Sequence, residues 1–141
     1  MKALVASLLL FVQAGQVPDK WECRNGLEPM SREQMKWVKP AKLKERIVSC
    51  SIPRLPPTYD AQGTVLFEVQ IDESGNIRCA RPLAGGTSVM RSAALEAAMK
   101  WRFKPLVVGG KAQPFRSVLW VLVHWDRSEA AKQCPQDKQR A

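Results

Sequence analysis

The most regular stretch of the sequence is Thr64-Val-Leu-Phe-Glu-Val-Gln-Ile71, in which apolar and polar residues alternate. Every second residue is β-branched or aromatic, and these residues are Val65, Phe67, Val69 and Ile71. The polar residues between them are Thr64, Glu68 and Gln70. A period of two with such side chains predicts a β-strand with one buried face and one polar face.

The residues that follow this strand have the composition of a tight turn. They are Asp72-Glu-Ser-Gly-Asn76, and Gly75 can adopt the positive φ that a short hairpin turn requires. We therefore expect a return strand from Ile77 to Pro82. Because proline has no amide hydrogen, this strand should end at Pro82 or lie at the edge of the sheet.

A helix is expected next, from Met90 to Trp101. Gly85-Gly86 precedes it as a turn, and Thr87 or Ser88 can cap its first turn. Its apolar stripe consists of Met90, Ala94, Leu95, Ala98 and Trp101. The small alanine side chains allow the helix to lie close to a sheet, and Pro105 limits how far the helix can extend.

The last expected strand, Ser117 to Trp125, is apolar on both faces. One face carries Val118, Trp120 and Leu122, and the other carries Leu119, Val121, Val123 and Trp125. Such a strand must be covered on both faces, or covered on one face and offered to a partner on the other. The order strand, strand, helix, strand over residues 58–125 predicts a two-layer α+β domain, in which a small antiparallel sheet packs on one helix.

The two regions that flank this domain are less regular. Residues 15–57 hold six of the ten prolines and are expected to be irregular, with one short helix from Ser31 to about Val38 and a second that begins at Pro40. Residues 126–141 are polar and are expected to form a loosely ordered tail, which is held in place only if Cys134 is bonded.

The N-terminus has the layout of a secretory signal peptide. Met1-Lys2 supplies a positive charge, residues 3–12 form an apolar run, and Val12-Gln-Ala14 presents a cleavage site to a signal peptidase. A membrane-spanning helix needs about 20 apolar residues, which is longer than this run. We therefore expect cleavage after Ala14, export to the periplasm and no membrane span in the mature chain.

The cysteines favour disulfides over a metal or redox site. They are Cys23, Cys50, Cys79 and Cys134, with separations of 27, 29 and 55 residues and no CxxC pair. In an exported chain, four cysteines predict two disulfides, and three connectivities are possible. We prefer Cys23–Cys50, because these two flank the irregular N-terminal region, together with Cys79–Cys134, which would pin the polar tail to the second strand.

Four pieces of the sequence occur in an order that one protein family shares. They are Gly63-Thr-Val-Leu-Phe-Glu-Val-Gln-Ile-Asp72, Gly75-Asn-Ile77, Ala93-Ala-Leu-Glu-Ala-Ala98 and Trp101-Arg-Phe-Lys-Pro105. Together they resemble the C-terminal domain of TonB, over the chain from about Pro53 to Trp125. The motif positions are Gly63, Asp72, Gly75, Ala94, Leu95, Trp101, Phe103 and Pro105. W-R-F-x-P just after an alanine-rich helix is the most specific of the four pieces.

The resemblance implies a β-β-α-β domain that acts outside the inner membrane. Members of the family that transduce energy bind a short extended segment of outer-membrane receptors by adding it to a sheet edge. The edge strand implied here consists of Ser117, Val118, Leu119, Trp120, Val121, Leu122, Val123, His124 and Trp125. A complete transducer also has a transmembrane anchor and a long Pro-rich spacer. Residues 15–57 lack a repeated Glu-Pro or Lys-Pro tract, so we expect a stand-alone periplasmic binding domain.

The composition leaves a second class of function open. Of 141 residues, 45% are hydrophobic and 25% are charged, which is typical of one soluble domain and excludes a wholly disordered chain. The net charge is +9, so a binder of polyanions such as lipopolysaccharide or wall polymer is an alternative. Its patch would comprise Arg91, Lys100, Arg102 and Lys104 around the helix end.

The first hypothesis is a module that binds an envelope protein by strand addition, with a link to TonB-type outer-membrane transport. In a further alternative, the last strand pairs across a structural homodimer.

An enzyme is not expected. Asp72 and Glu73 diverge in a turn, and His124, the one histidine, lies in an apolar strand and should be structural. We predict no cofactor, no metal and no nucleic acid.

Overall fold

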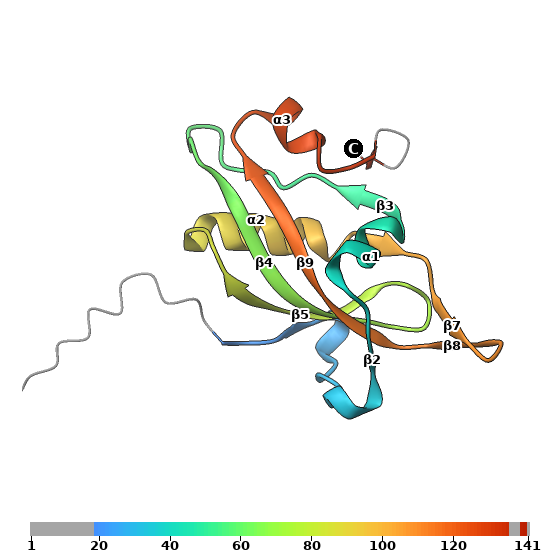
Figure 1. The fold of residues 1–141 in the computed structure, drawn as a ribbon. Coiled ribbons are helices and arrows are strands. Elements are labelled where there is room, and N and C mark those ends of the chain that lie inside the picture. The colour runs from blue at the N-terminus through green and yellow to red at the C-terminus, as the bar shows by residue number, and fades with distance from the viewer. Residues whose placement is uncertain (1–18, 136–138, 141) are drawn as a thin grey trace, which may run out of the picture.

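The main sheet has five strands in the order β1-β5-β4-β9-β2, and its three long strands form the centre (Figure 1). These are β4 (Gln62–Ile71), β5 (Ile77–Ala84) and β9 (Phe115–His124). The computed structural model describes residues 19–135 and 139–140, so the expected signal peptide lies outside the described residues. Helix α2 (Ser88–Ala98) packs on one face, and the predicted α+β fold is confirmed.

The hairpin of β4 and β5 forms as its sequence predicts, and both strands are two residues longer than expected, since β4 already begins at Gln62. The strand β5 continues beyond Pro82 to Ala84. Pro82 is tolerated there because β1 (Glu22–Cys23) pairs with β5 only at Cys79 and Ala80, so Pro82 lies on an uncovered part of that edge. In the turn, Asp72 Oδ1 accepts hydrogen bonds from the backbone amides of Ser74 and Asn76 at 2.9 and 3.0 Å.

Helix α2 is capped by Thr87, one of the two caps that the sequence offers, so it begins at Ser88, and it ends earlier than expected. The Thr87 side chain accepts a hydrogen bond from the amide of Met90, which caps the first turn. The expected helix end at Trp101 is wrong, because α2 stops at Ala98 and Trp101 enters the core from the connection that follows. Its indole Nε1 donates to the carbonyl oxygen of Ser51 at 2.8 Å, which gives the buried polar atom a partner.

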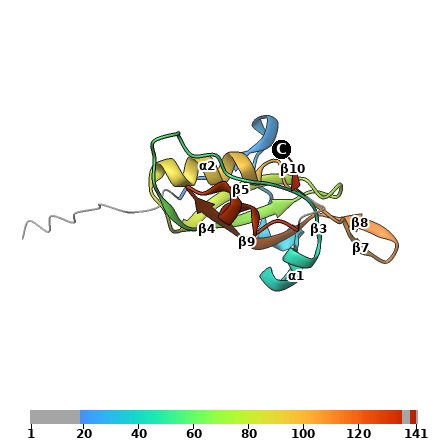
Figure 2. The ribbon, with the colours of Figure 1, turned by 90° about the horizontal axis from the view of Figure 1, so that it is seen from above.

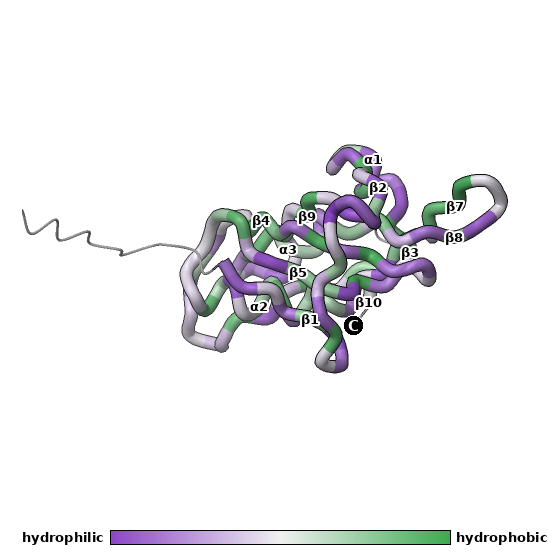
Figure 3. Tube along the Cα trace, turned by 90° about the horizontal axis from the view of Figure 1, so that it is seen from below, coloured by the Kyte–Doolittle hydropathy of each residue, from purple (hydrophilic) through white to green (hydrophobic). Residues whose placement is uncertain are grey.

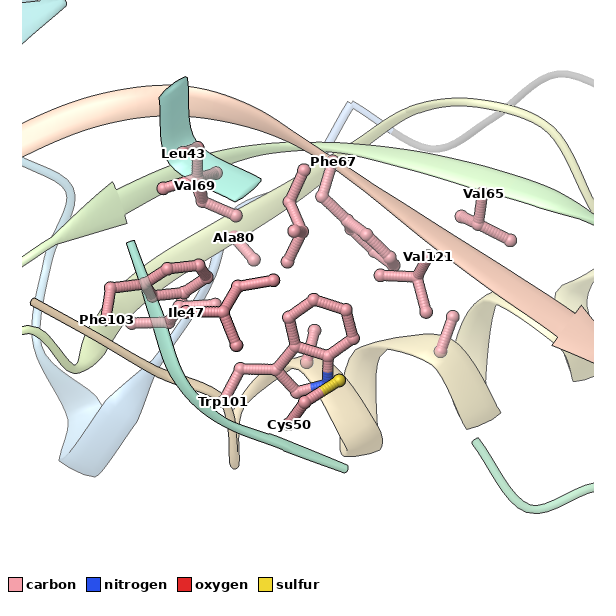
Figure 4. Close-up of a cluster of buried hydrophobic side chains, with 14 of the residues drawn as sticks. Leu43, Ile47, Cys50, Val65, Phe67, Val69, Ala80, Trp101, Phe103 and Val121 are labelled. Carbon is pink, nitrogen blue, oxygen red and sulfur yellow. The ribbon is translucent and has the colours of Figure 1, made fainter. Parts of the chain in front are cut away.

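The core lies between α2 and the sheet, and Figure 4 shows Trp101 at its centre. The side chains around it come from strands far apart in the sequence, and they include Ile47, Val65, Phe67, Phe103 and Val121. Four alanines of α2 are buried, Ala93, Ala94, Ala97 and Ala98, and of these Ala94 and Ala98 belong to the core. Their small size leaves the space that Trp101 and Phe67 fill.

Replacing Trp101 with phenylalanine is expected to lower the free energy of unfolding by about 1–3 kcal/mol, because the Ser51 carbonyl loses its buried donor. Urea unfolding followed by circular dichroism measures this change. Trp120→Phe is the matched control, since the Trp120 side chain is exposed and makes no buried hydrogen bond. Equal unfolding midpoints for the two variants would show that the indole hydrogen bond contributes nothing.

The second face of the sheet is covered by residues 19–38, which we call the N-terminal arm. The arm contains β1, the 3-10 turns Arg24–Gly26 and Arg32–Gln34, and β2 (Lys36–Trp37). It joins the sheet at both edges, because β1 pairs antiparallel with β5 and β2 pairs parallel with β9. Between these edges it crosses the face opposite α2, where the Gln70 side chain bonds both backbone groups of Met30 at 2.9 and 2.8 Å.

The N-terminal arm corrects two expectations, one for the polar face of β4 and one for residues 31–38. The face of β4 that the alternation marks as polar is buried, with Glu68 and Gln70 exposed by only 5% and 2%. Glu68 is neutralised there by ion pairs with Arg32 and Arg81. The helix expected from Ser31 to Val38 is only one short turn, after which the chain becomes strand β2.

The remaining elements surround one end of the main sheet. Helix α1 (Pro40–Glu45) starts at the expected proline, and β3 (Ile47–Ser51) forms a small sheet with β6 (Arg102–Phe103) and β10 (Gln139–Arg140). Figure 2 shows α1 and α2 on opposite sides of β4 and β9. The hairpin of β7 (Leu106–Val108) and β8 (Lys111–Gln113) projects from the body, with β7 hydrophobic and β8 hydrophilic (Figure 3).

Both disulfides form, but the preferred pairing was wrong. The bonds join Cys23 to Cys79 and Cys50 to Cys134. Cys23 lies directly opposite Cys79 because the arm adds β1 to β5, a pairing that has no periodic signal in the sequence. Cys134 follows helix α3 (Arg127–Ala131), which packs on β9, so residues 126–135 are structured rather than loose.

Candidate functional site

The strand β9 is paired unequally on its two sides. One side pairs with β4 over its whole length, from Phe115 opposite Ile71 to His124 opposite Gln62. The other side pairs with β2 at Phe115 and Arg116 alone among the described residues. Beyond Arg116, this second side is the outer edge of the sheet, and we call it the β9 edge.

Three hydrogen bonds establish which residues of β9 direct their backbone groups to the β9 edge. The carbonyl of Arg116 accepts from the amide of Val38 at 2.9 Å. The amide of Leu122 donates to Gln133 Oε1 at 2.7 Å, and the carbonyl of Leu122 accepts from Gln133 Nε2 at 2.8 Å. Since backbone direction alternates along a strand, Val118 and Trp120 also point their N–H and C=O groups outward.

The open part of the β9 edge is therefore shorter than the expected strand Ser117–Trp125. The hydroxyl of Ser117 donates a hydrogen bond to the carbonyl of Val38 at 2.6 Å, and the backbone of Leu122 is hydrogen-bonded to the side chain of Gln133. Between them, the outward backbone groups of Val118 and Trp120 make no hydrogen bond within the described chain. Trp125 lies beyond the end of β9, where its amide donates to the carbonyl of Ala61.

A groove of about 710 Å³ runs along this open part of the edge. Its walls are α1 on one side and the residues that follow α3 on the other. Its lining is mainly apolar and includes Leu43, Ile47, Trp101, Val118, Leu119 and Trp120. Lys44 and Lys132 also line the groove, and Lys132 is paired with Glu129 at 2.7 Å, so the groove combines an apolar floor, free backbone groups and a positive charge at Lys44.

The two faces of β9 differ in exposure, which settles a question that the sequence left open. Leu119, Val121 and Val123 are buried on the side of α2. Trp120, on the other face, is 63% exposed and is the most exposed large apolar residue among those described. Trp37 of β2 is also exposed and lies under the guanidinium of Arg116, with 5.0 Å from Cζ to the ring centre.

The wall of the groove behind Leu122 is built by a well-capped short helix. The Asp126 carboxylate accepts hydrogen bonds from the hydroxyl and the amide of Ser128, and these bonds lower the pKa of Asp126. His124 Nδ1 accepts a hydrogen bond from the amide of Asp126 at 2.9 Å. Both contacts fix where α3 begins and therefore where Gln133 lies.

The motif positions of the TonB resemblance support the fold, and Trp101 alone among them lines the groove at the β9 edge. Gly75 is at φ +86°, and its carbonyl accepts from the amide of Phe103 at 2.9 Å. A Cβ at Gly75 would overlap the Phe103 carbonyl, so this position needs glycine. The carbonyl of Pro105 accepts a hydrogen bond from the guanidinium of Arg46, so the end of the W-R-F-x-P motif is bound to the residue that follows α1. The sequence predicts a helix that begins at Pro40, but it does not show that α1 and Gln133 form the walls of a groove, because neither carries a recognisable motif.

The basic residues expected around the helix end do not all lie there, because Arg91 is at the other end of α2. Arg91 lies in the first turn of α2 and donates to the carbonyl of Gly86, whereas Lys100 follows the last turn. At 1.5 Å per residue, roughly 13 Å of helix axis separates the two. The patch of Arg91, Lys100, Arg102 and Lys104 is therefore divided between the two ends of α2.

Comparison with protein-family models matches residues 53–122 to the Gram-negative bacterial TonB protein C-terminal family. These residues belong to the TonB C-terminal family. No curated protein matches the chain. TonB C-terminal domains are non-enzymatic protein-interaction domains of energy transducers and lie in the periplasm of Gram-negative bacteria. In the described residues, no helix is long and apolar enough to cross a membrane.

The TonB-family match covers the β9 edge and leaves out the walls of the groove. Residues 53–122 contain β4, β5, α2 and β9 as far as Leu122. Helix α1 and Gln133 lie outside this range. The TonB C-terminal domain thus supplies the open edge, and the flanking segments of this chain supply its walls.

Proposed function

We propose that this chain is a periplasmic TonB-like module, which binds an extended segment of another envelope protein by adding that segment as a strand to the β9 edge. The observation that carries the proposal is the open backbone of Val118 and Trp120 beside an apolar groove of about 710 Å³. Export through a signal peptide at residues 1–14 is part of the proposal, as is a link to outer-membrane transport.

The edge offers a physical basis for both affinity and choice of ligand. Val118 and Trp120 provide two donors and two acceptors, and each hydrogen bond formed contributes about 0.5–1.5 kcal/mol net. Side chains of an added strand alternate between its two faces. One set would meet the apolar floor of Ile47 and Leu119, and the other would lie beside exposed Trp120.

Replacing Trp120 with proline tests the proposal, because proline removes one outward donor without removing a bond between β9 and β4. Trp120→Ala is the matched control, since alanine removes the same side chain and keeps the amide. The probe is a fluorescein-labelled nine-residue peptide of alternating valine and threonine, and its binding is followed by fluorescence anisotropy. We expect the dissociation constant of the proline variant to exceed that of the alanine variant at least tenfold.

Two further measurements separate the alternatives. Two N-methylated forms of the same peptide are prepared, one methylated on its odd-numbered residues and the other on its even-numbered residues. Only the form whose methyl groups replace the amide hydrogens that face the β9 edge should lose binding. Equal binding of Trp120→Pro and Trp120→Ala, or no effect of N-methylation, would refute strand addition. Binding of lipopolysaccharide that falls steeply with salt and is lost in the triple variant Arg91→Ala, Lys100→Ala, Arg102→Ala would support the polyanion alternative. A mass that doubles with protein concentration and is restored to monomer by Trp120→Pro would support the homodimer.

A further inference from the structure

The Gln133 side chain occupies the β9 edge in the way that a neighbouring strand would. Its amide both accepts from the Leu122 N–H, at 2.7 Å, and donates to the Leu122 C=O, at 2.8 Å. A paired strand satisfies an outward-facing residue through the same two bonds. Leu122 is two residues along from Trp120, so it is the next outward-facing position of the same edge.

Gln133 is held at this position from both sides along the chain. Before it, α3 is fixed by its Asp126 cap, and Gln133 Nε2 also donates to the carbonyl of Ala130 at 2.9 Å. After it, Cys134 is covalently bonded to Cys50 of β3. Cys50 and Cys134 are 0% and 4% exposed, so the anchor is buried within the core.

This anchoring makes Gln133 an effective competitor for the edge. A group tethered beside its binding position acts at a high local concentration, which a free ligand must overcome. A strand that extends from Val118 to Leu122 can bond the Leu122 backbone only after the Gln133 amide has left. A strand that stops at Trp120 leaves Gln133 in place and forms fewer hydrogen bonds.

We propose that Gln133 is an intramolecular inhibitor of strand addition, which blocks the Leu122 register and lowers the affinity of the β9 edge for extended peptides. The inference rests on the proposed function, since it concerns regulation of the same edge. The elements that hold Gln133, α3 and Cys134, both lie outside the family match, so the inhibitor is added to the TonB-type edge by the C-terminal flank of this chain.

Gln133→Met is the variant that tests this inhibitor, because methionine has a similar length and can neither donate nor accept these two bonds. Gln113→Met, at the end of β8, is the matched control on a glutamine away from the groove. Two quantities are measured for the wild-type protein and both variants. They are the hydrogen-exchange rate of the Leu122 amide in the free protein and the affinity for the valine–threonine peptide described above.

Gln133→Met is expected to speed exchange at Leu122 at least tenfold and to tighten peptide binding about tenfold, since two hydrogen bonds no longer compete. Gln113→Met should change neither quantity. Faster exchange with unchanged affinity would overturn the inference and leave strand addition intact. Unchanged exchange at Leu122 would also overturn it. Absence of peptide binding to the wild type and to Gln133→Met alike would overturn both the inference and the proposed function. A near-ultraviolet circular dichroism spectrum identical to the wild type shows that the variant is folded.

Discussion

The double substitution Cys50→Ala and Cys134→Ala is expected to lower the free energy of unfolding by about 4.5 kcal/mol, since the bond closes a loop with a sequence separation of 84 residues. The same change should release α3 and Gln133 from the β9 edge, because Cys134 is the covalent anchor behind them. Urea unfolding measures the stability, and hydrogen exchange at Leu122 measures the release.

The other disulfide provides a matched control for this prediction. Cys23→Ala with Cys79→Ala should cost about 4 kcal/mol, because that loop has a separation of 56 residues. It should leave exchange at Leu122 unchanged, since β1 lies at the opposite edge of the sheet. Equal acceleration at Leu122 in both double variants would mean that the Cys50–Cys134 bond has no local role at the groove.

Gly75→Ala is expected to destabilise the domain by about 2–5 kcal/mol. An L-residue at φ +86° costs about 1–2 kcal/mol, and forcing the new Cβ away from the Phe103 carbonyl adds about 1–3 kcal/mol. The amide of Phe103 would lose its bond to Gly75 as the two backbones separate. The shift in the urea midpoint, read by tryptophan fluorescence, measures the total effect.

Gly110→Ala isolates the conformational part of this cost. Gly110 has a similar φ of +78°, and its added Cβ would meet nothing within 4 Å. We expect a loss of about 1–2 kcal/mol for this variant. If Gly75→Ala and Gly110→Ala shift the midpoint equally, the close approach of Gly75 to Phe103 is energetically unimportant.

The long elements of this fold could be predicted because each carries a periodic signal. The alternation of Val65, Phe67, Val69 and Ile71 gives the central strand, and the alanine spacing gives α2. The two-residue strands β1 and β2 are too short to show any period. Without them, Glu68 and Gln70 could not be recognised as buried, and the partner of Cys23 could not be identified.

The sequence predicts which strand offers the open edge of the candidate site, but it does not predict how much of that edge is open. The apolar run from Ser117 to Trp125, together with the family motifs, predicts β9 as the strand that offers an edge. How much of that edge is open depends on α1 and Gln133, which meet β9 only in the folded chain. A glutamine that bonds a backbone eleven residues away has no signature in a linear sequence.

The Cys23–Cys79 bond also determines how the domain would carry mechanical load. Tension applied to the chain ahead of Cys23 passes directly into β5 through the sulfur–sulfur bond. The bond carries this tension past residues 24–38 of the N-terminal arm, so the arm is not peeled from the sheet first. If a partner held the β9 edge, the pull would cross the sheet from β5 through β4 to β9. The added strand, attached by a few backbone hydrogen bonds, would be the first joint in this path to give way.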